Sequence, residues 1–130
     1  MQQRKIIIKK WITRDDLRNN PDKVYLFGDN LMRKGMGGQA KEMRDEPNAV
    51  GIATKMSPYS YMTDETYDFN VSSFQTDFNK IPEDKDIVIP ADGLGTGLAM
   101  LDKMAPKSFE YLQNYIESLK NLAITIEYED

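Results

Sequence analysis

Cysteine and histidine are both absent from this chain of 130 residues. Without cysteine the chain has no disulfide, no thiol nucleophile and no thiolate metal site. Without histidine it also lacks the usual general base at neutral pH and the most common zinc ligand. Chemistry must then come from lysine, carboxylates, tyrosine, backbone amides or a hard cation with oxygen ligands. The acidic residues do not have calcium-loop or two-metal spacing, so the sequence predicts no metal and no cofactor.

Long apolar runs are missing as well. The apolar run at residues 6–8 is flanked by lysines and is too short for a signal peptide or a membrane span. The chain carries 21 acidic and 17 basic residues, for a net charge of −4. A negative balance does not draw a whole molecule to nucleic acid or to an anionic membrane. We therefore expect a cytoplasmic protein with no membrane partner.

The length suits a single domain, 1–130, that can bury a hydrophobic core without needing disulfides or a metal for stability. Strand-forming residues predict five strands, at 4–12, 23–27, 49–54, 86–90 and 123–128. Helical spacing and capping signals predict four helices between them, at 13–19, 39–44, 71–81 and 106–119. This alternation predicts an α/β fold, with three layers around a central, mostly parallel or mixed sheet.

Some local placements can also be predicted. The lysines of strand 4–12 favour an edge position, and Trp11 is expected to pack beside that strand. Strand 86–90 is a continuous apolar run, which is typical of a central strand covered on both faces. Residues 55–69 show little periodicity and predict a loop or flap. This flap carries three tyrosines, Tyr59, Tyr61 and Tyr67. They either stack on a ligand or, as the favoured reading, pack the flap onto the body.

Seven of the eight glycines gather in two loops, each between a predicted strand and a predicted helix. The first loop holds Gly28, Gly35, Gly37 and Gly38, and the second holds Gly93, Gly95 and Gly97. Backbone N–H groups in such loops can cradle phosphate oxygens, and two loops at one sheet edge suit a diphosphate. Tight turns without a ligand are the alternative. Neither the dinucleotide-binding fingerprint nor the P-loop pattern is present.

The two loops resemble those of macrodomains. Residues 27–40, with a strand ending in Asp-Asn and a glycine cluster before a helix, are similar to the first ligand loop of that family. Residues 89–98, Ile-Pro-Ala-Asp-Gly-Leu-Gly-Thr-Gly-Leu, are similar to the second loop. Between them, Thr54-Lys55 resembles the strand end of the terminal ADP-ribose glycohydrolase branch. The resemblance extends from about residue 23 to residue 128.

This resemblance implies a macrodomain-like domain that binds ADP-ribose or a related NAD-derived nucleotide. It also implies a partner, which is free ADP-ribose or an ADP-ribosylated macromolecule, with nucleic acid included only as a modified substrate. The ligand-binding residues expected on this basis are Gly28, Asp29, Asn30, Gly35, Gly37, Gly38, Gly93, Gly95, Thr96, Gly97 and Leu98. Asn30 would hold the distal ribose.

The resemblance further implies a hydrolase that breaks a bond at the distal ribose, by de-ADP-ribosylation or removal of a 1″-phosphate. Lys55 would attack the anomeric carbon, which requires that its surroundings favour the free amine. The family's usual catalytic acids are missing, because Ala40 and Ala99 occupy their positions. Asp29, Asp92 or Asp102 would have to replace them. The alternative is a non-catalytic protein that reads or sequesters an ADP-ribose-like signal.

Overall fold

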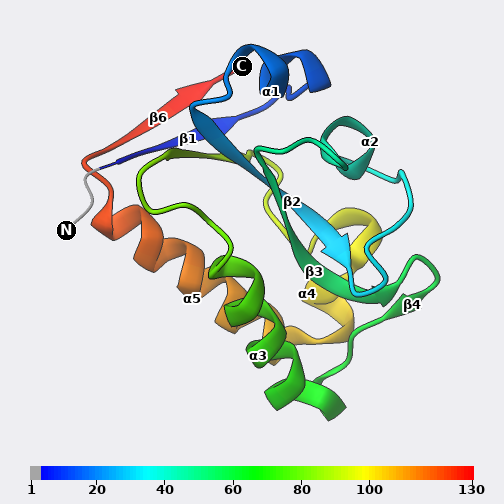
Figure 1. Cartoon of the computed structure of the whole chain (residues 1–130). Helices are drawn as coiled ribbons and strands as arrows, with labels where there is room; N and C mark the ends of the chain where they lie inside the picture. The colour runs from blue at the N-terminus through cyan, green and yellow to red at the C-terminus, as the bar shows by residue number, and fades with distance from the viewer. Residues whose placement is uncertain (1–3) are drawn as a thin grey trace.

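The computed structural model describes residues 4–130 and contains a six-stranded sheet with strand order β4-β3-β2-β5-β1-β6 (Figure 1). The strands are β1 (Lys5–Lys9), β2 (Lys23–Asn30), β3 (Ala49–Ser57), β4 (Ser60–Tyr61), β5 (Asp86–Pro90) and β6 (Thr125–Glu129). All neighbours are parallel except β3 and β4, which form an antiparallel hairpin. The helices are α1 (Arg14–Asn19), α2 (Ala40–Met43), α3 (Tyr67–Phe78), α4 (Leu101–Met104) and α5 (Pro106–Leu122), with short 3-10 turns at Asp64–Thr66 and Gly97–Ala99.

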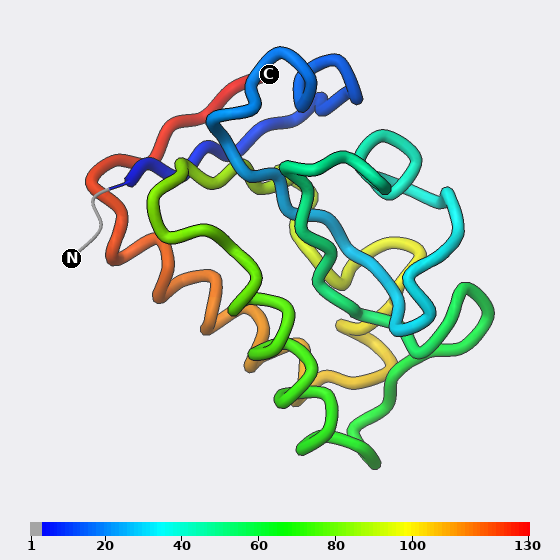
Figure 2. The backbone as a smooth tube through the Cα atoms, in the orientation of Figure 1, coloured from blue at the N-terminus to red at the C-terminus, as the bar shows by residue number. Residues whose placement is uncertain are grey.

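Helices cover both faces of the sheet, because successive residues of the central strands alternate between two cores. Leu26 of β2 lies in the core formed with α3 and α5, where Leu112 is fully buried. The next residue, Phe27, lies in the opposite core with Leu17 of α1 and Met43 of α2. The tube in Figure 2 follows the same arrangement, with α3 and α5 side by side on one face. The predicted mixed α/β fold with a mostly parallel sheet is therefore confirmed.

Two predictions about the first strand are wrong. β1 is an interior strand between β5 and β6, although lysines flank it. Its lysines mark no edge because Lys5 and Lys9 pair with Glu127 and Glu129 of the neighbouring strand. The strand also ends at Lys9, so Trp11 lies beyond it and is 75% exposed rather than packed.

The predicted flap at 55–69 is wrong for most of its length. β3 continues to Ser57 and turns into β4, and α3 begins at Tyr67. Met62 is the residue that anchors this segment, with 1% of its surface exposed. Tyr59, at the hairpin turn, is 93% exposed, so this tyrosine does not hold the segment down as predicted.

The first turn of α5 is capped from a distant part of the chain. The Asp64 carboxylate accepts hydrogen bonds from the backbone N–H groups of Lys107 (2.9 Å) and Ser108 (3.0 Å) and from the Ser108 hydroxyl (2.7 Å). Partial burial opposes ionisation of Asp64, but these hydrogen bonds outweigh it and hold its pKa below the ordinary value of 3.8. The carboxylate therefore joins the segment before α3 to the start of α5.

Removing this cap should cost stability in a pH-dependent way. We expect Asp64→Ala to lower the free energy of unfolding by about 1 kcal/mol at pH 7. Because the folded-state pKa is below the unfolded value, the contribution is complete above about pH 4 and is lost as the pH falls through the folded pKa. Urea unfolding at pH 7 and pH 3 measures both effects. Glu65→Ala, at the adjacent exposed carboxylate, is the control and should change little; equal losses in the two variants would contradict the capping role.

Within residues 4–130, no helix combines the length and the apolar character that crossing a lipid bilayer requires.

Candidate functional site

The chain connections that leave β2 and β5 run in opposite directions along the sheet. From the end of β2 the chain passes through α2 to β3 on one side, whereas from the end of β5 it passes through α4 and α5 to β6 on the other. β2 and β5 are parallel neighbours, so the loops that leave their carboxyl ends diverge. Open α/β sheets bind ligands in the crevice at such a point.

The two strands also separate from each other at this end. β2 pairs with β5 only through Lys23, Val24 and Tyr25. Beyond Tyr25, β2 continues along β3 to Asn30, while β5 continues along β1 to Pro90. The resulting fork leads into a cavity of about 580 Å³. That volume lies within the usual range for small-molecule and cofactor sites.

The cavity brings together the residues predicted from the sequence. Both glycine loops line it, and so do all the predicted ligand-binding residues together with Lys55 and Asp92. The first glycine loop lies close to the second glycine loop and to the β3–β4 hairpin, which form the other walls of the cavity. A Cβ atom on Gly37 would lie 3.4 Å from Leu98 Cδ1, and one on Gly35 would lie 3.6 Å from Pro58 Cγ. The loops after β2 and β5 and the β3–β4 hairpin therefore surround one space.

Asn30 and Lys55 lie side by side at the ends of β2 and β3. The pairing of these strands is irregular after Asp29, which pairs with Ala53, so that Asn30 pairs with Lys55. Asn30 Oδ1 accepts a hydrogen bond from the Met32 N–H (3.0 Å), and its Nδ2 donates to the Lys34 carbonyl (2.7 Å). The Asn30 side chain therefore shapes the first loop, and the predicted contact with a ribose stays a prediction.

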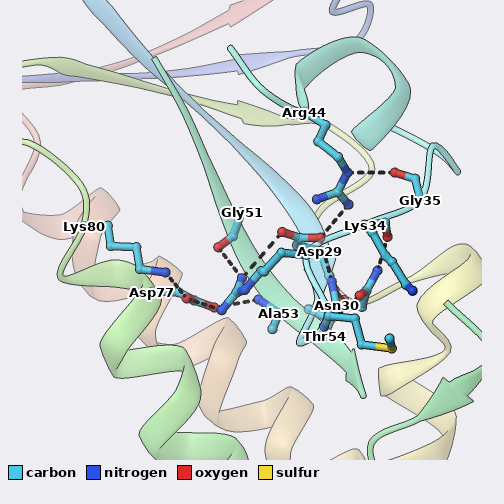
Figure 3. A network of polar contacts seen from close by, with 12 residues as sticks. Asp29, Asn30, Lys34, Gly35, Arg44, Gly51, Ala53, Thr54, Asp77 and Lys80 are labelled. Carbon is cyan, nitrogen blue, oxygen red and sulfur yellow. Dashed lines mark hydrogen bonds and ion pairs between the residues drawn. The ribbon is translucent and has the colours of Figure 1, made fainter. Parts of the chain in front are cut away.

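Asp29 is held in place as a counter-ion. Its side chain is only 4% exposed, and Oδ1 accepts hydrogen bonds from Arg44 Nη2 (2.6 Å) and the Asn30 N–H (2.8 Å). The other oxygen lies 3.5 Å from Arg33 Nη1. These contacts give Asp29, predicted above as a ligand-binding residue and as a possible catalytic acid, the role of a counter-ion. Asp29 pairs with Arg33 inside the first loop and with Arg44 beyond it, and Figure 3 shows the Asp29–Arg44 pair.

Arg33 extends this network to α3. Its Nη2 donates to Asp77 Oδ1 (2.6 Å) and its Nη1 donates to the Gly51 carbonyl (3.2 Å). Asp77 is fully buried and also accepts from the Ala53 N–H (2.8 Å) and from Lys80 (3.0 Å), as Figure 3 shows. The first glycine loop is therefore tied to β3 by a hydrogen bond and to α3 by an ion pair.

Arg44 fixes the far end of the first loop. Its Nε donates to the Gly35 carbonyl (2.7 Å), and its guanidinium group lies 5.6 Å from the centroid of the Phe27 ring. The side chain lines the cavity but is only 11% exposed. Sequence reasoning missed Arg44, although an arginine soon after a glycine loop is a signal that could have been weighed.

The remaining charges favour an anionic ligand. Lys34, Lys55 and Asp92 line the cavity, and within residues 4–130 neither lysine has a carboxylate at ion-pair distance. Lys55 Nζ donates to the Pro58 carbonyl (2.8 Å) and lies 5.2 Å from the centroid of the Tyr61 ring. Since Asp29 is neutralised by arginines, two lysines face one carboxylate in this space.

A family model covers most of the chain. The model of a family of unknown function, DUF7831, matches residues 7–115, which include both glycine loops and Lys55. The chain belongs to the DUF7831 family. No curated protein and no solved structure matches the chain.

The second glycine loop of this DUF7831 member is anchored between its glycines. Leu94 is buried in the core, with the backbone of Gly93 and Gly95 at positive φ on either side. A Cβ on Gly95 would lie 3.0 Å from Leu101 Cδ2 and 3.2 Å from Leu101 Cβ, so a larger residue there would have to displace Leu101. Gly97 also has a positive φ (62°), but a Cβ added to it would have no neighbouring atom within 4 Å. A side chain at Gly95 would therefore point toward the core, whereas Gly97 lines the cavity and has open space around its Cβ position.

Proposed function

We propose that the cavity binds ADP-ribose or a related NAD-derived nucleotide in a macrodomain-like arrangement. One observation carries this proposal: two glycine loops, from neighbouring parallel strands that diverge, line a single cavity. The resemblance of both loops to macrodomain ligand loops supplies the ligand class. The partner is then free ADP-ribose or an ADP-ribosylated macromolecule.

The chemistry of the lining suits a diphosphate. Glycine-rich loops expose backbone N–H groups, which donate to phosphate oxygens at little steric cost. Lys34 and Lys55 add positive charge that no carboxylate of residues 4–130 neutralises, and a diphosphate attracts such charge. The chain as a whole is acidic, so this local charge favours a small anion over an extended polyanion.

Calorimetry with ADP-ribose tests the proposed ligand. We expect saturable binding with a Kd below about 1 mM, which corresponds to a favourable binding free energy of more than about 4 kcal/mol. AMP lacks the second phosphate and the distal ribose, and it should bind at least roughly tenfold more weakly because it cannot span both loops. Absence of heat at millimolar ADP-ribose, with circular dichroism showing folded protein, would remove the proposal.

Hydrolysis at the distal ribose is a second candidate, favoured by Lys55 and Asp92 lining the same cavity. The Lys55 amine would form a bond to the anomeric carbon as the bond to the leaving group breaks, and water would then release the ribose. Asp29 does not serve as the acid, because arginines hold it. Ala40 and Ala99 occupy the other positions and Asp102 does not line the cavity, so among the described residues Asp92 remains there for that role. A non-catalytic reader is the alternative.

Substitution of Lys55 distinguishes the enzyme from the reader. If the chain is a hydrolase, Lys55→Ala should reduce turnover of ADP-ribosylated protein at least 100-fold while ADP-ribose still binds. Lys34→Ala removes the other unpaired lysine of the cavity and should lower affinity without abolishing turnover. Wild-type protein that binds ADP-ribose but turns over no substrate identifies a reader, and turnover that survives Lys55→Ala excludes the lysine mechanism.

A further inference from the structure

The strand β6 forms a long open edge of the sheet. It is the outermost strand beside β1 (Figure 1), and within residues 4–130 no strand pairs with its outer side. The opposite edge strand, β4, has only two residues, whereas β6 has five. Proteins usually shorten, cover or charge an edge, because its free N–H and C=O groups can pair with another strand.

The backbone direction along β6 identifies which groups are available. The Lys10 N–H donates to the Glu129 carbonyl (3.0 Å), so Glu129 faces β1. Lys9 faces away from β6, because its carbonyl accepts from the Ala91 N–H that follows β5. Strand residues alternate in direction, so the N–H and C=O groups of Ile126 and Tyr128 point outward from the edge.

An apolar stripe accompanies these free backbone groups. Alternate residues at the end of α5 and along β6 are exposed hydrophobic residues: Leu122 (71%), Ile124 (53%), Ile126 (38%) and Tyr128 (76%). Ile126 pairs with Ile6 and Tyr128 pairs with Ile8, so these side chains lie on the sheet face that α5 covers further inward. α5 buries Ile6 but leaves the stripe open.

The acidic residues of the edge do not protect it. Each carboxylate at this end of the chain pairs with a lysine: Glu127 with Lys5 (3.2 Å), Glu129 with Lys9 (3.6 Å) and Asp130 with Lys10 (3.8 Å). The charge on the edge is therefore balanced within one copy, and it does not repel a second acidic strand as unpaired carboxylates would.

We propose that β6 pairs antiparallel with β6 of a second copy, around a two-fold axis at Ile126. The outward N–H and C=O groups of the two Ile126 residues then bond to each other, and the two sheets become one. In this register Glu127 lies opposite Thr125, and Tyr128 lies opposite Ile124, which precedes β6 and donates its N–H to the Arg4 carbonyl (2.9 Å). An axis at Glu127 would instead place two carboxylates directly opposite each other. The balanced charge and the outward backbone groups therefore favour β6 of a second copy as the strand that pairs with β6. This proposal does not depend on what the cavity binds.

Single cysteines test this register, because the chain has none of its own. In an antiparallel hydrogen-bonded pair the Cα atoms lie about 5.5 Å apart, within disulfide range. Ile126→Cys should therefore form a linked dimer under mild oxidation. In the same register Glu127→Cys and Tyr128→Cys place their Cα atoms roughly 8 and 14 Å apart, beyond the limit of about 7 Å. These two variants are matched controls and should stay unlinked.

Light scattering on the unmodified chain gives the second measurement. We expect about twice the 15.0 kDa of one chain at roughly 100 µM, a concentration suited to moderate affinities. Ile126→Arg should return the mass to one chain while circular dichroism still shows folded protein, whereas Phe69→Arg, at an exposed residue of α3, should leave the dimer intact. A wild-type mass of one chain at this concentration, or linking of Glu127→Cys in place of Ile126→Cys, would overturn the proposal.

Discussion

Gly51→Ala is expected to lower the free energy of unfolding by about 3 kcal/mol, through crowding and a broken buried ion pair. A Cβ at this position in β3 would lie 2.5 Å from Asp29 Oδ2 and 2.9 Å from Asp29 Cβ. Asp29 cannot turn away without leaving Arg44, which it meets at 2.6 Å. The added methyl group therefore forces either the strands apart or the network open. Urea unfolding measures the loss.

Gly28→Ala is the matched control, because it adds the same methyl group to the neighbouring strand. There the new Cβ would lie 3.5 Å from Thr54 Oγ1, which is an ordinary contact. We expect a loss within about 1 kcal/mol. If the crowding is against Asp29, the double variant Asp29→Ala, Gly51→Ala should be more stable than the two single losses predict. Simple additivity would show that Gly51 is needed for another reason.

The second large effect concerns Gly97 and ligand affinity. If the cavity binds ADP-ribose, Gly97→Val should weaken binding at least 100-fold, because the side chain would project into the open space beside the loop. The positive φ adds a strain of about 1–2 kcal/mol, which the fold should survive. Calorimetry measures the affinity, and thermal unfolding measures the strain.

Gly97→Ala separates the two causes. It shares the positive φ but adds only one carbon, so it should be more stable than the β-branched valine variant and retain more affinity. Equal affinity losses in the two variants would mean that backbone strain, not occupied space, decides binding. Gly95→Val is unsuitable for this test, since its side chain would collide with Leu101 in the core and destabilise the fold.

Much of the fold could be predicted because its signals are local. The capping residue Thr13, the apolar run at 86–90 and Pro106 at the start of a helix each mark an element that the structure contains. The strand–helix alternation then predicted the mixed α/β fold, and the two glycine loops predicted which residues line one cavity. What that cavity binds stays a prediction.

The errors came from interactions between distant residues. The lysines of β1 are neutralised by carboxylates more than a hundred positions away, so the strand occupies an interior position that its own composition disfavours. The pair Arg33–Asp77 joins a loop to a helix turn, and neither residue carries a local signal of it. Residues 55–69 lacked periodicity because a hairpin, a 3-10 turn and a helix start share one short segment.

The short pairing between β2 and β5 means that a ligand in the cavity should affect the stability of the sheet. The half of the sheet containing β4, β3 and β2 joins the half containing β5, β1 and β6 through only three residue pairs. A molecule bound by both glycine loops would contact both halves of the sheet and link them. Its free energy of association then adds to the cohesion of the whole sheet, so occupancy and resistance to heat should rise together.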